Sequence, residues 1–164
     1  MSDADLKARV EELMPRARRD LAELVAFRSV ADPAEFPAEE CDRAASWLVD
    51  AFTDVGLTEV AAHETSDGSK AVLGHRPAPP GAPTVLLYCH YDVVAPLAEA
   101  DWGTPAFELT EREDGRWYGR GTADCKGNVV AHLTALRALG DELGVGVKVI
   151  AEDRRSRGPA ASRR

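Results

Sequence analysis

Two short segments contain residues that could bind a metal ion, and each follows or precedes an expected strand or helix. In the first, His90 and Asp92 are separated by one residue just past an apolar run. In an extended chain their side chains point the same way. Because a metal-bound imidazole usually donates its other N–H to a carboxylate, the two could be a ligand and its orienting partner. The alternative is a histidine that is hydrogen-bonded to a nearby aspartate for structural reasons.

The second segment is glycine-rich and covers residues 119–128, with Asp124 directly before an expected helix. Glycine permits the tight backbone turns that such a loop needs. Asp124 could be the N-cap of that helix or a metal ligand, and the local pattern does not choose between them. Cys89 and Cys125 flank the two candidate ligands. Thiolates bind zinc well, but the favoured interpretation of both is a small buried apolar side chain.

The expected elements place both segments at the ends of strands or helices. Apolar residues at helical spacing predict a helix over residues 6–25, which Pro15 should kink or divide. Further helices are expected over 38–55 and 126–139, with Gly56 and Gly140 as C-terminal caps. Expected strands are 58–62, 70–73, 84–89 and 145–151, and Asp114-Gly115 signals a hairpin. The continuous apolar run 84–89 is typical of a strand covered on both faces. This order predicts an α/β fold with a mixed sheet flanked by helices.

Composition limits the function classes. The 164 residues include 20 basic and 28 acidic ones, a net charge of −8. That balance argues against binding to nucleic acid or to an anionic membrane surface. Three cysteines without CxxC spacing suggest neither a disulfide framework nor a structural zinc knuckle. The charged start lacks the apolar run of a signal peptide, and no stretch is long and apolar enough to span a membrane, so the expected location is the cytoplasm.

Three motifs in order resemble those of a known family. His90–Pro96 is similar to its HxDVxP segment, residues 102–107 to its W…PF segment, and residues 118–127 to its YGRGxxDxKG segment. The family is the co-catalytic zinc metallopeptidases, which include aminoacylase, acetylornithine deacetylase, succinyl-diaminopimelate desuccinylase, glutamate carboxypeptidase and the carnosinase-type dipeptidases. The resemblance covers roughly residues 10–152 and is nearest to the dipeptidase branch.

The resemblance implies a partial zinc exopeptidase domain of the phosphorylase/hydrolase-like kind. In it His90 would bind one zinc ion, Asp92 would orient His90 as a catalytic residue, and Asp124 would bridge two zinc ions, with a cis peptide bond after Asp124. Cobalt or manganese are alternative metals. The implied activity is hydrolysis of a peptide or amide bond by a zinc-activated water, on a dipeptide or an N-acyl amino acid, in an intact parent that is a homodimer.

The family pattern breaks after the last expected strand. The family continues with Glu-Glu-x-Gly-Ser, which supplies the general base and a zinc ligand, whereas this chain continues with Arg154 and four more arginines. Allowed codons for residues 154–163, read from the third base, encode Glu-Glu-Ser-Gly-Ser-Gly-Gly-Leu-Ala. We therefore expect residues 1–152 to be the front of a catalytic domain, residues 153–164 to be an out-of-frame tail, and the dimerisation domain to be absent. The alternative function is a catalytically inactive fragment, because His90 and Asp124 alone are too few ligands for tight zinc binding.

Overall fold

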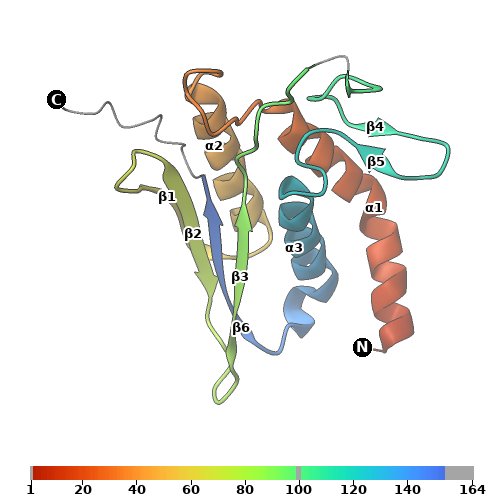
Figure 1. The fold of residues 1–164 in the computed structure, drawn as a ribbon. Helices are drawn as coiled ribbons and strands as arrows, with labels where there is room; N and C mark the ends of the chain where they lie inside the picture. Colours follow the sequence, from red (N-terminus) through yellow and green to blue (C-terminus); the bar gives the residue numbers. More distant parts are fainter. Residues whose placement is uncertain (1, 99–100, 154–164) are drawn as a thin grey trace.

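The computed structural model describes residues 2–98 and 101–153. Three helices lie to one side of a sheet in Figure 1, and two short strands form a separate hairpin. The helices are α1 (Asp3–Ala26), α2 (Glu39–Asp54) and α3 (Lys126–Leu139), followed by the short 3-10 helix η2 (Gly140–Glu142). The strands are β1 (Thr58–Glu64), β2 (Lys70–Arg76), β3 (Thr84–His90), β4 (Thr110–Glu111), β5 (Trp117–Tyr118) and β6 (Gly146–Glu152). None of the helices in this part of the chain has the length and apolar character needed to cross a membrane.

The main sheet is mixed, which confirms the predicted α/β class. Its strand order is β1-β2-β6-β3. β2 pairs antiparallel with both β1 and β6, whereas β3 pairs parallel with β6. Because β3 and β6 run the same way, α3 can connect them across one face of the sheet, and the carboxyl ends of both strands meet at one edge.

The core lies between the sheet and the helices. Inward-facing sheet residues, among them Val72, Cys89 and Val149, are buried against apolar residues of α2 and α3. α1 packs chiefly on α3 and buries the stripe that includes Leu21 and Leu24. This arrangement fixes α1 and α3 relative to each other, which matters for the loop that precedes α3.

Of the two predicted effects of Pro15, a kink or a division of the first helix, the division does not occur. α1 runs without interruption from Asp3 to Ala26 with Pro15 inside it. Proline removes one backbone donor and leaves the carbonyl one turn earlier without its partner. Here Pro15 lies on the exposed face, where water can bond that carbonyl. A capping box between Ser2 and Asp5 also secures the start of the helix.

The prediction that residues 84–89 are covered on both faces is also wrong. Among the described strands β3 pairs with β6 alone, so it is an edge strand, and the helices cover one face of the sheet. As a result Val85, Leu86 and Tyr88 are 43%, 57% and 54% exposed. An apolar run indicates that a strand is suited to burial on both faces. Among the described residues, however, no element covers the second face of β3.

The other predicted elements are confirmed with small shifts at their ends. α3 has the predicted bounds and ends at Gly140, while β1 and β2 continue two and three residues past their predicted ends. The Asp114-Gly115 turn joins β4 and β5, and Gly115 has a φ of 74°. Residues 154–164, the predicted out-of-frame tail, lie outside the described residues.

Candidate metal centre

His90 is the last residue of β3, and the chain that follows it is held firmly at the edge of the sheet. The Tyr91 N–H donates to the carbonyl of Glu152 at 3.0 Å, which continues the pairing of β3 with β6 by one step. The Ser29 hydroxyl donates to the Tyr91 carbonyl at 2.7 Å, and the Val93 N–H donates to the Ser29 carbonyl at 2.8 Å. These bonds fix the backbone on both sides of Asp92.

The loop that carries Asp124 needs glycine at two positions. Gly121 has a φ of +86°, and a Cβ there would lie 2.9 Å from Val93 Cγ1. A Cβ on Gly127 would lie 2.0 Å from the carbonyl oxygen of Thr122, which no side chain could accommodate. The glycines therefore let this loop pass close against the segment that follows His90, and so bring the two candidate segments together.

Lys126 anchors the same loop to the end of α1. Its side chain is fully buried, and its Nζ donates to the carbonyl oxygens of Leu24 and Phe27, both at 2.7 Å. Those carbonyls belong to the last turn and C-cap of α1, where the helix itself offers no donors. Burial lowers the pKa of Lys126 to about 7. No role for Lys126 was predicted from the sequence, because its partners Leu24 and Phe27 lie about a hundred residues earlier in the chain.

The side chains of His90, Asp92 and Asp124 meet at this edge. His90 Nε2 lies 3.0 Å from Asp124 Oδ1, and His90 Nδ1 lies 3.3 Å from Asp92 Oδ1. His90 and Asp92 are largely covered, whereas the Asp124 side chain is 88% exposed. Ligand atoms of His90, Asp124 and Cys125 all lie within 4.8 Å of one another. The peptide bond between Asp124 and Cys125 is cis, as the resemblance implied.

The lone pairs in this group favour a cation. His90 Nδ1 lies 3.2 Å from the backbone carbonyl oxygen of Asp92 as well as 3.3 Å from its Oδ1. If Nδ1 carries a proton toward these oxygens, Nε2 presents a lone pair to Asp124. Two acceptor atoms 3.0 Å apart repel each other unless a proton or a metal ion lies between them. Two atoms bound tetrahedrally at about 2.1 Å to one zinc ion would be roughly 3.4 Å apart, so only a small shift is needed. The donor set therefore fits a divalent metal ion.

The structure bears on two alternatives, Asp124 as a helix cap and the two cysteines as metal ligands. Asp124 does not cap α3, because the N-cap residue is Cys125 and no side chain bonds to the first turn. Cys89 is fully buried, and burial raises the pKa of its thiol to about 12, which keeps it neutral. Cys125 is also buried, and its sulfur accepts a bond from the Asn128 amide at 3.2 Å. Only Cys125 of the two thiols joins the candidate group.

Glu152 lies beside this group but is engaged elsewhere. It is the register partner of His90, and its carboxylate accepts a hydrogen bond from the Tyr88 hydroxyl. This bond raises the pKa of Tyr88 to about 12. Asp153, the next residue, is buried, and its N–H donates to the Lys70 carbonyl at 3.0 Å.

Comparisons with known proteins identify the fold and the family. Residues 86–153, which include both candidate segments, match the sequence model of peptidase family M20/M25/M40. The cysteinylglycine-S-conjugate dipeptidase of Corynebacterium striatum is 42% identical over 144 residues, which are 85% of this chain and 31% of that protein. This match confirms the resemblance to peptidase family M20/M25/M40.

Two further proteins are similar to this chain. The Cys-Gly metallodipeptidase of Candida albicans is 32% identical over 158 residues, which cover 87% of this chain and 32% of that protein. The crystal structure of human carnosine dipeptidase 1 superposes with a TM-score of 0.79 at 28% identity, over 92% of this chain and 34% of that one. The chain thus spans about a third of the length of the relatives that it matches.

Proposed function

We propose that this chain is the metal-binding front part of a dipeptidase. The observation that supports it most is the opposed pair of His90 Nε2 and Asp124 Oδ1, 3.0 Å apart, with Asp92 behind the histidine. The relatives that share this part of the chain add support, because they are a Cys-Gly metallodipeptidase and two other dipeptidases. The substrate we propose is a dipeptide or an N-acyl amino acid.

Each side chain in the group has a distinct role in this proposal. His90 and Asp124 hold the metal, with Asp124 placed at the exposed side where it could bridge to a second ion. Asp92 keeps the proton of His90 on Nδ1, so that Nε2 faces the ion. A bound divalent ion supplies Lewis-acid activation of the amide carbonyl and of water. We propose zinc as the ion, with cobalt and manganese as alternatives.

The described residues do not complete the site. A catalytic zinc site normally has three protein ligands, and hydrolysis also needs a general base. Within residues 2–98 and 101–153 the candidate group consists of His90, Asp124 and Cys125. Each of these would be a metal ligand, so the group contains no further residue to act as the general base. We therefore propose that the 164-residue chain binds metal weakly and does not catalyse hydrolysis by itself.

We further propose that the family's glutamate pair is encoded in another frame directly after Asp153. The match to the family description ends at this residue. Nucleotide sequencing through codon 153 tests the idea. A long open frame that continues with Glu-Glu-Ser-Gly-Ser supports it, and a frame without family-like residues rules it out. In that case the chain as given would be an inactive relative, which is the second candidate function. A homodimer and a cytoplasmic location, in keeping with three free cysteines, belong to the same proposal.

The activity itself is tested by expressing the chain with its reading frame corrected after codon 153. The expected result is hydrolysis of Cys-Gly that needs added zinc, stops with a chelator, and is lost in the His90→Ala and Asp124→Ala variants. Replacement of the exposed His63, which lies on β1 away from the group, is the matched control and should leave the rate unchanged. Hydrolysis that persists in both ligand variants would exclude the proposed site.

A further inference from the structure

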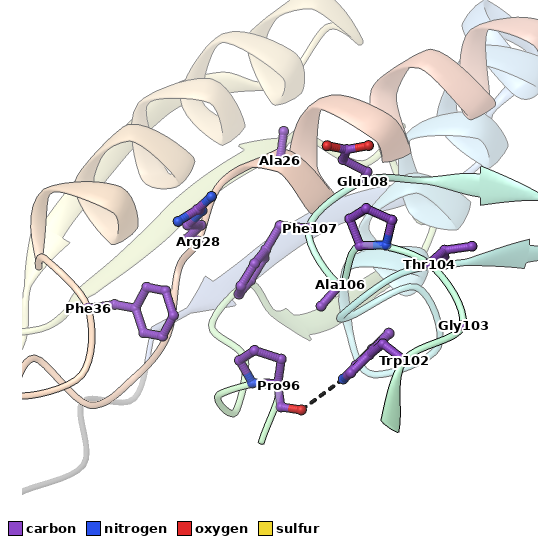
Figure 2. A pocket seen from close by; sticks show the side chains of 11 residues that line it. Ala26, Arg28, Phe36, Pro96, Trp102, Gly103, Thr104, Ala106, Phe107 and Glu108 are labelled. Carbon is purple, nitrogen blue, oxygen red and sulfur yellow. Dashed lines mark hydrogen bonds between the residues drawn. The ribbon is translucent and has the colours of Figure 1, made fainter. Parts of the chain in front are cut away.

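A pocket of about 600 Å³ opens between the end of α1 with the loop that follows it, which contribute Ala26, Arg28 and Phe36, and the segment after His90, which contributes Pro96 and residues 102–108. Its walls are both polar and apolar, and three aromatic side chains, those of Phe36, Trp102 and Phe107, contribute to them. Phe36 and Phe107 meet edge to face with ring centroids 5.7 Å apart, and Trp102 and Pro96 form another wall. In Figure 2 the Phe107 ring lies between Phe36 and Trp102. A flat apolar or aromatic group would find ring surfaces on more than one side here.

The walls of this pocket are tied to the candidate metal centre. The Trp102 indole N–H donates to the Pro96 carbonyl at 2.8 Å, six residues after His90. The Arg120 guanidinium lies 4.9 Å from the Trp102 ring centre and donates to the Ala95 carbonyl at 3.3 Å. Arg120 is itself in the loop that ends at Asp124. Trp102, one wall of the pocket, is therefore in contact with both loops that carry the candidate metal ligands.

Arg28 is the cation among the described residues that line this pocket. Arg28 is exposed and lies over the Phe107 ring, with its Cζ 5.6 Å from the ring centre. Among the described residues it takes part in no salt bridge, since the nearby Glu40 accepts from the Arg28 backbone N–H and pairs with Arg43. A guanidinium held on a ring face and not already paired is suited to a carboxylate.

We propose that this pocket binds a small carboxylate with an aromatic or bulky apolar body, the apolar part between Phe36, Phe107 and Trp102 and the carboxylate on Arg28. Given the proposed function, on which this assignment rests, the pocket selects N-acyl amino acids and peptides with such a group. Glu108 is the acidic residue that lines the pocket. A ligand with a single negative charge should therefore bind more tightly when Glu108 is neutralised and more weakly when Arg28 is neutralised.

The test uses N-benzoylglycine, an aromatic ring joined through an amide to a carboxylate, and the metal-free 164-residue chain. Titration is followed by the indole N–H signals of the three tryptophans in nitrogen–proton NMR spectra. The Trp102 signal should shift and saturate, while that of Trp47, whose N–H is bonded to Glu23, should stay in place. The uncharged amide of the same compound should bind more weakly.

Variants separate charge recognition from general packing. Arg28→Gln should weaken binding about tenfold, because it removes a hydrogen bond to a charged group. Arg43→Gln is the matched control, since Arg43 also lies over a phenylalanine ring, at 5.3 Å from Phe27, but does not line the pocket. Glu108→Gln should tighten binding. No saturable shift at Trp102, or equal losses in the two arginine variants, would overturn the assignment.

This experiment is independent of the metal. If the metal binds but N-benzoylglycine does not, the pocket assignment fails and the dipeptidase proposal stands. If N-benzoylglycine binds as expected but no metal does, the proposed function fails and the pocket remains a carboxylate site.

Discussion

Replacing Lys126 by methionine tests how the loop before α3 is held in place. Methionine keeps most of the apolar stem but removes the donors to the carbonyls of Leu24 and Phe27. Two buried carbonyls without donors cost about 1–3 kcal/mol each. Against this stands the cost of burying the amine, whose pKa falls from 10.5 to about 7. At pH 8 the folded chain must release a proton that the unfolded chain keeps, which costs about 3 kcal/mol.

In Lys126→Met the loss of two hydrogen bonds and the removal of the buried amine nearly cancel at pH 8, but only the second effect depends on pH. Between pH 7 and 10.5 the unfolded chain binds the proton of Lys126 and the folded chain does not, so the stability of the native chain rises with pH. The methionine variant lacks this contribution. We therefore expect the loss in free energy of unfolding caused by Lys126→Met to grow by about 1.4 kcal/mol per pH unit between pH 7.5 and 9.5.

The assay is urea unfolding of the metal-free chain and of the variant at several pH values, followed by circular dichroism. Lys148→Met, which replaces an exposed lysine on β6, is the control and should show no pH-dependent difference. A loss in Lys126→Met that stays constant across this range would refute the reasoning. It would mean that the two 2.7 Å bonds keep the amine charged in spite of its burial.

Three further predictions follow from the structure. Asp92→Asn should weaken metal binding by about 10–100-fold, measured by calorimetry, without changing the circular dichroism spectrum, because Asp92 orients His90. Hydrogen bonds from Ser69 and Thr65 hold the pKa of Asp67 well below its usual value. The contribution of Asp67 to stability should therefore be present above about pH 4 and lost as the pH falls through this lowered pKa. Ser69→Ala should raise the pKa of the Asp67 carboxyl in an NMR titration. Leu86→Lys should reduce self-association in sedimentation experiments while changing stability by less than about 0.5 kcal/mol, because Leu86 is 57% exposed on an edge strand.

The local pattern of the sequence was enough to predict most elements. Helical spacing and the two glycine caps located α2 and α3, and the Asp114-Gly115 turn located the hairpin. What local pattern could not predict was the surroundings of β3. Its apolar residues are suited to burial, but whether a strand is covered depends on residues far away in the chain.

The candidate site was also predictable only in part, because local pattern indicates its ligands but not its long-range contacts. Alternation along a strand correctly put His90 and Asp92 on the same side, and the resemblance singled out Asp124. The supports were missed because they are long-range contacts. Lys126 reaches α1 about a hundred residues earlier, and Ser29 bonds to Tyr91 across 62 residues. The pocket around Phe107 likewise needs Arg28 and Phe36 from another part of the chain, and no local signal indicates that they meet.

The most direct test of the account is binding of a divalent ion to the purified 164-residue chain. Cobalt is added in place of zinc, and its visible absorption reports the ligand atoms, while calorimetry with zinc gives the affinity. The native chain should bind the ion weakly, and either His90→Ala or Asp124→Ala should weaken the binding at least about tenfold, whereas His63→Ala should leave the Kd unchanged. If metal binds equally well to all three variants, or to none of the proteins including the native chain at millimolar metal, the proposed metal centre is contradicted.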